Sequence, residues 1–405
     1  MTIRTVPLDE QDDASRHDDL TILVVGAGVA GLAAAQLLRA DGHHPILVER
    51  RDPEADAGYM VALMPLADGP IADLGVRQEY LARSVPLDRF RFRAHSGRSL
   101  RTDGLEDVVG RYGDYRGLTR GALLDVIAGE DAAVTHRTTV TGLDEDPEGV
   151  GVTVETEGTV RTLRVDAVVI ADGIGSRTRS LLPGAAPLHR VETGWGGWVA
   201  WTPLDADVDL GEELWGDGFF IGTYPVPGAL GAFVGGPEQE TRQGPAAFAD
   251  VVRRKLGTAP PRIEDALRAV AAAEAPFFWP LADVRAARWT TRRTVLLGDA
   301  AAGFLPTAGI GAGMALESAW VLASHLRGAT TETIGEALAA YESAQRPRVE
   351  TAQNTSRSLA RLMFRRGRAL ASARDLLLRV LSIGTALRPI VRLLADRPAL
   401  PARQR

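Results

Sequence analysis

Three glycines near the start of the chain, Gly26, Gly28 and Gly31, have the spacing Gly-x-Gly-x-x-Gly that can bring a backbone close to phosphates. The apolar run 22–25 before them predicts a buried parallel strand, and the leucines and alanines after them recur at helical spacing. Gly26 would allow a tight turn, Gly28 the approach of a pyrophosphate, and Gly31 close packing of the helix on the strand. The N–H groups at the helix N-terminus would then bind the phosphates.

Glu49 indicates which dinucleotide such a unit would bind. It follows the apolar run 46–48, where a carboxylate can accept a hydrogen bond from an adenosine ribose hydroxyl. The same charge would repel a 2′-phosphate, which disfavours NADP at this site and leaves FAD or NAD. The later glycine-rich stretches ADGIGS and GIGAG lack the strand–helix–strand arrangement of a second unit. We therefore expect any second nucleotide to bind only transiently.

Composition limits the classes of protein that this chain can belong to. Its 405 residues, 45% hydrophobic and 24% charged, are those of an ordinary globular protein with room for two domains. A net charge of −6 gives no reason to expect nucleic-acid binding. The absence of cysteine excludes disulfides, thiolate metal sites and a cysteinyl flavin link, and no histidine has a metal-ligand spacing, so we expect no metal.

The termini and the charge pattern predict location and source. Residues 1–19 are acidic and lack an apolar core, which predicts a disordered lead-in and no signal peptide. No window is long and apolar enough for a transmembrane segment. Lys255 is the only lysine among many arginines, which is typical of a GC-rich bacterial genome. We expect a cytoplasmic, bacterial protein.

Local patterns predict the remaining elements. Residues 88–101 alternate and turn at Ser96-Gly97, which predicts a hairpin, whereas 118–129 have helical spacing. The segment 149–173 predicts antiparallel strands that lead into a buried strand at 167–171. From about 191 to 278 the chain is rich in Gly, Trp, Pro and Phe in short strand-like runs, and after a strand at 295–297 it is largely helical.

Two further motifs follow the glycine fingerprint at wide separation. ADGIGSRTR contains Asp172, Gly173, Ser176 and Arg179, and GDAAAGFLPTAGIGAG begins with Gly298 and Asp299 and contains Pro306, Gly309 and Gly311. Together with the fingerprint that ends in Glu49-Arg50, these motifs resemble those of the p-hydroxybenzoate hydroxylase-like, single-component (group A) FAD-dependent monooxygenases. The resemblance covers roughly residues 20–348.

The resemblance implies an α/β fold: a Rossmann-like FAD-binding domain with an inserted β-rich substrate domain and C-terminal helices. We expect the FAD-binding domain to comprise 20–190 and 280–330, with 81–101 as a candidate part of the substrate domain. The substrate domain would be 191–279 and the C-terminal helices 331–405.

The resemblance also implies roles for individual residues. Asp299 would bind ribityl or ribose hydroxyls of non-covalent FAD, and the helix after Pro306 would stabilise negative charge on the N1–O2 edge of the reduced flavin. Asp172 would serve both FAD and the pyridine nucleotide, with Arg179 meeting phosphate charge. Arg120 would contact FAD near its pyrophosphate, with a solvated helix arginine as the alternative. The full set of expected FAD contacts is Gly26, Gly28, Gly31, Glu49, Arg50, Arg120, Asp172, Asp299, Pro306, Gly309, Gly311 and Ala312.

The chain departs from the common family pattern at four positions. The usual His is Ala302, the usual Gln is Ile310, a frequent Asn is Gly313 and the usual Asp is Ser318. Backbone contacts survive these changes because the glycines and the helix start remain. The departures bear on how the coenzyme is handled and on the outcome of the reaction.

The function implied is an FAD-dependent, NAD(P)H-consuming monooxygenase that hydroxylates an aromatic or polycyclic small molecule with O₂ through a flavin C4a-hydroperoxide. The cofactor carries the chemistry, so we assign no catalytic residue. The reductant would be NADPH or NADH, and the protein a monomer or homodimer. The alternatives are a related oxidase, dehydrogenase or halogenase of secondary metabolism, or a non-catalytic FAD-binding protein.

Aromatic residues in the strand-like region are candidates for a flat substrate pocket, with plain core packing as the alternative for each one. By strand alternation Trp195 and Trp201 share one face, and Trp198 takes the other. The pocket candidates are Trp198, Trp201, Phe220 and Tyr224.

Overall fold

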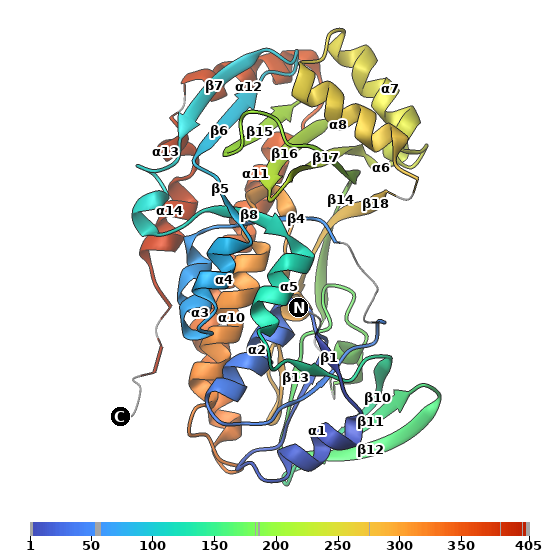
Figure 1. The fold of residues 1–405 in the computed structure, drawn as a ribbon, viewed down its shortest axis with the longest axis vertical. Coiled ribbons are helices and arrows are strands. Elements are labelled where there is room, and N and C mark those ends of the chain that lie inside the picture. Colours follow the sequence, from blue (N-terminus) through green and yellow to red (C-terminus); the bar gives the residue numbers. More distant parts are fainter. Residues whose placement is uncertain are drawn as a thin grey trace.

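A four-stranded parallel sheet forms the base of the molecule (Figure 1). The computed structural model describes residues 3–52, 58–182, 184, 187–274, 276–380, 382–398 and 400–401. The strand order is β19-β13-β2-β3, with β2 at Ile22–Val25, β3 at Ile46–Val48, β13 at Ala167–Ile170 and β19 at Thr294–Leu296. Every residue of these strands is buried, as expected of a parallel sheet covered on both faces. The predicted strand–helix–strand unit and the buried strand at 167–171 are confirmed.

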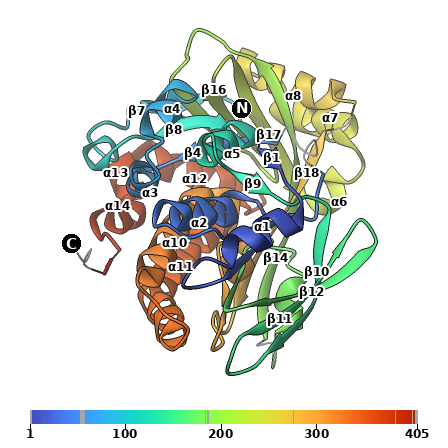
Figure 2. The same ribbon diagram turned by 60° about the horizontal axis from the view of Figure 1, so that its bottom comes forward.

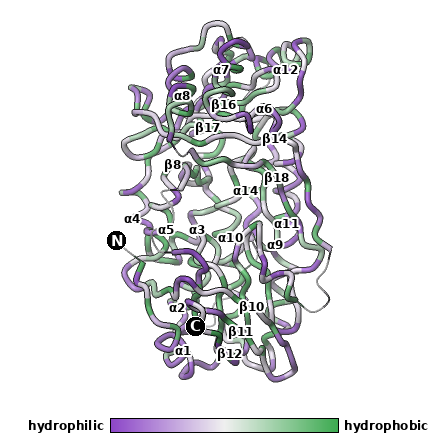
Figure 3. Tube along the Cα trace, turned by 90° about the vertical axis from the view of Figure 1, so that its right-hand side faces the viewer, coloured by the Kyte–Doolittle hydropathy of each residue, from purple (hydrophilic) through white to green (hydrophobic). Residues whose placement is uncertain are grey.

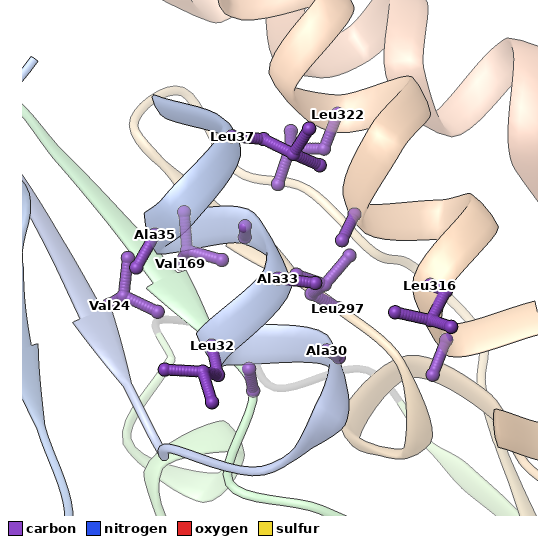
Figure 4. Packing of buried hydrophobic residues seen from close by; sticks show 14 of the residues in the cluster. Val24, Ala30, Leu32, Ala33, Ala35, Leu37, Val169, Leu297, Leu316 and Leu322 are labelled. Atoms are coloured by element: carbon purple, nitrogen blue, oxygen red, sulfur yellow. The ribbon is translucent and has the colours of Figure 1, made fainter. Parts of the chain in front are cut away.

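Helix α2 (Val29–Ala40) packs against this sheet, and α10 (Gly311–Leu326) packs against α2. Leu32 and Ala35 of α2 point toward Val24 and Val169 of the sheet, whereas Leu37 points toward Leu322 of α10 (Figure 4). Small residues on α2 allow this close approach. The packing fixes the N-termini of both helices beside the carboxyl ends of the strands.

A second sheet of seven strands lies at the other end of the molecule, under α6, α7 and α8 (Figure 3). Its order is β18-β14-β17-β16-β15-β6-β7, with β6 at Arg89–Arg93, β7 at Ser99–Gly104, β14 at Leu188–Pro203, β15 at Leu210–Trp215, β16 at Phe220–Val226, β17 at Ala229–Pro237 and β18 at Phe277–Ala286. The covering helices are α6 (Glu238–Thr241), α7 (Pro245–Leu256) and α8 (Pro261–Ala272).

The hairpin predicted at 88–101 is confirmed as β6 and β7, with Gly97 at φ +82° in the turn. Parallel pairing of β6 with β15, in which Arg89 is opposite Leu210, places this hairpin in the same sheet as strands much later in the chain. The sheet thus extends beyond 191–279 on both sides, since β14 begins at Leu188 and β18 ends at Ala286. The division into a FAD-binding and a substrate domain stays a proposal.

Two smaller sheets of three strands each accompany these two sheets. Strands β10 (Thr138–Glu145), β11 (Val150–Thr156) and β12 (Thr159–Val165) form an antiparallel sheet that leads into β13, and α5 (Arg120–Ala128) is the helix predicted at 118–129. Strands β4 (Met60–Leu63), β5 (Val85–Pro86) and β8 (Arg116–Thr119) form a three-stranded sheet, near α3 (Asp68–Asp73) and α4 (Arg77–Ala82).

The C-terminal region is helical, as predicted, with α11 at Ile334–Met363, α12 at Arg368–Val380, α13 at Ile383–Ala386 and α14 at Arg388–Ala395. Helix α11 runs beside α10, and α12 continues toward the hairpin β6–β7 (Figure 2). Within the described ranges, each helix is too short or too polar to traverse a lipid bilayer.

The N-terminal residues are ordered, so the predicted disordered lead-in is wrong for residues 3–19. Strand β1 (Arg4–Thr5) pairs with β9 (Ala133–Val134), and α1 (Leu8–Ser15) follows. The buried side chain of Gln11 bonds both the N–H and the C=O of Leu47 and the hydroxyl of Thr135. A few inward-facing residues therefore fix this segment, although its composition is acidic.

Candidate active site

The carboxyl ends of the parallel strands bring together residues from all three sequence motifs. Gly26 follows β2 with φ +102°, and a Cβ on it would lie 2.6 Å from the carbonyl oxygen of Ala171 and 2.8 Å from Cα of Asp172. A Cβ on Gly31 would overlap the carbonyl oxygen of Gly26. Both positions therefore require glycine, one for the turn and one for helix–strand packing.

Gly28 differs from Gly26 and Gly31 because it is surrounded by open space and not by closely packed atoms. It is the N-cap of α2, its φ of −75° suits any residue, and no atom lies within 4 Å of a Cβ placed there. Open space thus lies directly before a helix N-terminus, where unpaired N–H groups can bind an anion. This geometry fits a pyrophosphate.

Glu49 lies at the end of β3 beside the same glycine turn. Its Oε2 accepts a hydrogen bond from the backbone N–H of Ala27 at 2.9 Å, and its Oε1 accepts one from the backbone N–H of Arg51 at 2.9 Å. A carboxylate has about four acceptor positions, so two remain for a ribose hydroxyl. Arg50 is exposed at the surface.

Asp172 has one carboxylate oxygen that no described residue satisfies. Its Oδ2 accepts hydrogen bonds from the N–H groups of Arg177 and Thr178, both at 3.2 Å, whereas its buried Oδ1 has no partner in the described part of the chain. A buried acceptor without a donor is costly, so this atom fits a hydroxyl of a bound cofactor.

Arg179 is occupied by the protein itself. Its guanidinium donates to the carbonyl oxygen of Ala300 at 2.6 Å and to that of Ile174 at 3.4 Å, and burial lowers its pKa. The side chain therefore joins the loop after β13 to α9 (Asp299–Ala302). Its contact with a pyridine nucleotide stays a prediction.

Asp299 begins α9 at the end of β19, next to the N-terminal half of α2. A Cβ on Gly298, at φ +58°, would lie 2.7 Å from Cβ of Ala30. The carboxyl group of Asp299 is half-buried, and burial raises its pKa to about 6. A small pocket lies beside it, lined by Trp289, Gly298, Asp299, Ala302, Phe304, Gly311, Met314, Ala315, Ser318 and Val349.

The segment from Pro306 to Ala312 forms the entry to α10. Pro306 begins a 3₁₀ turn that ends at Gly309, whose φ is +63°, and Gly311 and Ala312 are the first two residues of the helix. A Cβ on Gly309 would lie 4.0 Å from the hydroxyl of Tyr115. The helix N-terminus can thus stabilise negative charge placed before it.

Three of the four departures from the family pattern lie in tightly packed or buried surroundings. A Cβ on Gly313 would lie 2.5 Å from Leu66, so no larger side chain fits. Ser318 is buried and accepts a hydrogen bond from Gln345 at 3.1 Å. Ala302 is buried where its backbone pairs with that of Arg285.

Arg120 lies at the first position of α5, after Thr119, whose hydroxyl caps the helix by accepting from the N–H of Ala122 at 3.1 Å. The backbone N–H of Arg120 donates to the carbonyl oxygen of Tyr59 at 2.8 Å. A Cβ on Gly58 would lie 3.0 Å from that of Arg120. The contact of Arg120 with FAD stays a prediction.

The seven-stranded sheet turns one face, here called the inner face, toward the Gly309 turn. On this face Trp195, Phe220 and Phe233 pack against Leu305, which precedes the turn. Trp201 and Tyr224 lie in one row across the sheet, both paired with Gly231, and Met60 fills the space over that glycine. Trp201 is 37% exposed and Tyr224 is half-buried, whereas Phe220 is a core residue with 8% exposure.

Trp198 does not join that group, so its prediction as a partner of Phe220 and Tyr224 in one pocket is wrong. Strand alternation puts it on the opposite face, where its ring packs 4.8 Å from that of Phe278. Its indole N–H donates to the carbonyl oxygen of Thr241 at 3.2 Å, under α6. The strand alternation used in the sequence analysis had already placed Trp198 on the face opposite to Trp195 and Trp201.

Sequence reasoning missed Glu213 and Tyr115, both half-buried near the inner face. The signal for Glu213 is in the strand LGEELW, where alternation places an acid on the same side as Trp215. In the described ranges no group of three or more His, Asp or Glu side chains is arranged to hold a metal ion.

Comparison with known proteins identifies the class. Residues 19–356 match the family model described as FAD binding domain, and the chain belongs to that family. It is 32% identical over 366 residues to 3-amino-4-hydroxybenzoate 2-monooxygenase PtnB3 of Streptomyces platensis, covering 83% of this chain and 86% of that protein. It is 29% identical over 330 residues to 2-heptyl-3-hydroxy-4(1H)-quinolone synthase of Pseudomonas aeruginosa, covering 75% of this chain and 80% of that protein.

Solved structures share the fold. Klebsiella pneumoniae HpxO, complexed with FAD and uric acid, has a TM-score of 0.82 at 23% identity, covering 93% of this chain and 97% of that one. The 2-methyl-3-hydroxypyridine-5-carboxylic acid oxygenase has a TM-score of 0.73 at 22% identity, covering 95% and 99%. The protein is an FAD-dependent monooxygenase, which confirms the family, the fold class and the cofactor predicted from the sequence.

Proposed function

We propose that this monooxygenase hydroxylates an aromatic or polycyclic small molecule with O₂, using NADPH or NADH as a transient reductant. One observation carries the proposal. The segment that begins with Asp299 and contains the Gly309 turn also contains Leu305, which packs with Trp195, Phe220 and Phe233 of the inner face. A ring held on that face would lie beside a cofactor held at the carboxyl ends of the parallel strands.

The chain's own groups have separable tasks in this proposal. The N-terminus of α2 binds the pyrophosphate, while Asp172 and Asp299 accept hydrogen bonds from cofactor hydroxyls. The N-terminus of α10 stabilises negative charge, and the apolar inner face holds the substrate ring and excludes water. Bound FAD supplies the electron transfer from the nicotinamide and the reaction with O₂.

The named relatives support an aromatic substrate. One acts on 3-amino-4-hydroxybenzoate, and the HpxO structure contains uric acid. The chain has only one glycine fingerprint in a strand–helix–strand frame, which supports transient binding of the reductant. A cytoplasmic location and a monomeric or homodimeric state belong to the same proposal.

Labelled oxygen tests the reaction type. The purified protein should release about one non-covalent FAD per chain on denaturation. With the right aromatic compound its NAD(P)H oxidation should accelerate, and one oxygen atom of ¹⁸O₂ should appear in the product. Label that comes only from water, or full turnover without oxygen, would contradict hydroxylation and favour an oxidase or dehydrogenase.

The other two alternatives receive less support. A flavin halogenase of this superfamily would be expected to place a lysine near the substrate, but Lys255 lies on α7, outside the inner face, with Nζ 3.4 Å from a carboxylate oxygen of Glu240. A non-catalytic FAD-binding protein would not consume NADH or NADPH in the presence of any aromatic compound, so the same assay distinguishes it.

A further inference from the structure

Two side chains hold the carboxylate of Glu213 on the inner face of the seven-stranded sheet. Its Oε1 accepts a hydrogen bond from the hydroxyl of Tyr224 at 2.6 Å, and its Oε2 accepts one from the indole N–H of Trp215 at 2.7 Å. Gly222 is the residue paired with Glu213 across the strands, and a Cβ there would lie 2.8 Å from the Tyr224 ring. The missing side chain therefore lets Tyr224 reach the carboxylate.

Glu213 has no cationic partner among the described residues, unlike its neighbour. Glu212 points to the opposite face, is fully buried, and is paired with Arg91 at 3.1 Å and Arg93 at 2.8 Å. Burial raises the pKa of Glu213, and only the hydrogen bonds from Tyr224 and Trp215 oppose that rise. A half-buried carboxylate without a cation beside it is costly, and a donor on a bound ligand would lower that cost.

Tyr115 connects this carboxylate to the cofactor edge. It lies close enough to Glu213 for that charge, together with burial, to raise the pKa of its hydroxyl. The same hydroxyl lies 4.0 Å from the Cβ position of Gly309 and has no hydrogen bond to any residue that the structure describes. The Glu213–Tyr224 pair thus lies on the inner face, which is turned toward the Gly309 turn.

The polar atoms left over at this pair are acceptors. A carboxylate has about four acceptor positions, of which two are occupied in Glu213. The hydroxyl of Tyr224 has a single proton, which it donates to Glu213, so only its acceptor positions remain. We propose that Glu213, fixed by Tyr224 and Trp215, determines substrate specificity by binding an amino or hydroxyl donor of the aromatic substrate and rejecting a ring with a carboxylate at that position. This inference rests on the proposed function, because it takes the inner face as the substrate site.

Ligand binding to the oxidised holoprotein tests the inference without turnover. Dissociation constants would be measured from the change in flavin absorbance for catechol, for guaiacol, in which one hydroxyl is methylated, and for benzoate. Wild-type protein should bind catechol at least ten-fold more tightly than guaiacol, because a hydrogen bond to a charged acceptor is lost. Glu213→Gln should reduce this preference at least five-fold and bind benzoate more tightly than wild type.

Two further variants control for structural effects. Tyr224→Phe removes one holder of the carboxylate and should weaken the catechol preference partly, even if Glu213→Gln folds poorly. Glu212→Gln neutralises a buried acid on the opposite face, and it should lower the melting temperature without changing the preference. Equal preference in wild type and both site variants, or no preference in wild type, would overturn the inference.

The outcomes also separate this inference from the proposed function. A preference for catechol that depends on Glu213, in a protein that incorporates no label from ¹⁸O₂, would keep the acceptor site and reject the hydroxylase. Label incorporated by a Glu213→Gln variant that binds ligands with wild-type preference would keep the hydroxylase and reject the acceptor site.

Discussion

The carboxyl group of Asp299 has no ion pair in the described part of the structure, and burial raises its pKa to about 6. In the unfolded chain the same group titrates near 4. The folded apoprotein therefore binds its proton more tightly, so this residue's contribution to stability is complete at low pH and is lost as the pH rises through 6. If cofactor hydroxyls donate to Asp299 as proposed, they bind its ionised form, and FAD binding is then coupled to loss of this proton.

We expect the affinity of the apoprotein for FAD to increase as the pH rises from 5 to 7 and to level off above that. Asp299→Asn should remove this pH dependence and weaken binding by roughly 1.5–3 kcal/mol, the value of a hydrogen bond to a charged group. Fluorescence titration of the apoprotein with FAD measures both effects. An unchanged dissociation constant would show that Asp299 does not bind the cofactor.

Substitutions at two glycines of the fingerprint should separate an effect on apoprotein stability from an effect on FAD affinity. Gly26→Ala must place a Cβ 2.6 Å from the Ala171 carbonyl oxygen at φ +102°, so we expect it to destabilise the apoprotein by more than about 1 kcal/mol. Gly28→Ala meets open space at an ordinary φ, so apoprotein stability should stay within about 0.5 kcal/mol while FAD affinity falls. Thermal unfolding without FAD and FAD titration check the pair; equal melting temperatures would contradict it.

At the scale of elements, β14 presents two tryptophans to two different environments. Trp198 packs under α6 against Phe278, so Trp198→Ala should lower stability by on the order of 3 kcal/mol and leave the coupling of folded enzyme unchanged. Trp201 lies in the row of Tyr224 on the inner face, so Trp201→Ala should increase peroxide release per NAD(P)H consumed. A peroxide assay and thermal unfolding distinguish the two; exchanged phenotypes would show that the inner face is wrongly assigned.

Local patterns predicted the elements whose evidence lies within a short window. The signals for four elements come from residues that are neighbours in sequence: the turn at Gly26, the helix after it, the hairpin at Gly97 and the buried strand at 167–171. The parallel pairing of β6 with β15 could not be predicted, because it joins segments far apart whose own alternation is the same in either arrangement. For the same reason Glu213 was missed, since its significance arises only where β15, β16 and Tyr115 meet.

At the scale of the whole molecule, the C-terminal helix α12 is attached to the seven-stranded sheet. Arg374 of α12 is buried and donates to the carbonyl oxygens of Trp215 and Gly216, and Asp375 accepts from the ring of His95 at 2.6 Å. Helix α12 is thus attached to the end of β15, the strand that contains Glu213.

We expect Arg374→Met to remove the hydrogen bonds to three carbonyl groups, those of Trp215, Gly216 and Met363, and to destabilise the protein by about 1–3 kcal/mol. It should also weaken the catechol preference, because the end of β15 loses its support. Arg379→Met, an exposed change on the same helix, is the matched control and should alter neither quantity. Thermal unfolding and flavin absorbance titration measure both; a normal preference in Arg374→Met would show that β15 holds its position without α12.

The attachment of α1 to Leu47 has a practical consequence for solubility. Strand β3 is the edge of the parallel sheet, where Thr135 pairs with the C=O of Leu47 and the N–H of Glu49, and Gln11 binds the N–H of Leu47. Without Gln11 this N–H would be free to pair with another chain. Deleting residues 1–19 as a dispensable tail would expose this apolar edge, and we expect the shortened protein to aggregate on purification. Light scattering would detect this, and Gln11→Ala in the full chain should show a weaker form of the same behaviour. An N-terminal fusion is better joined through a flexible linker that leaves this segment in place.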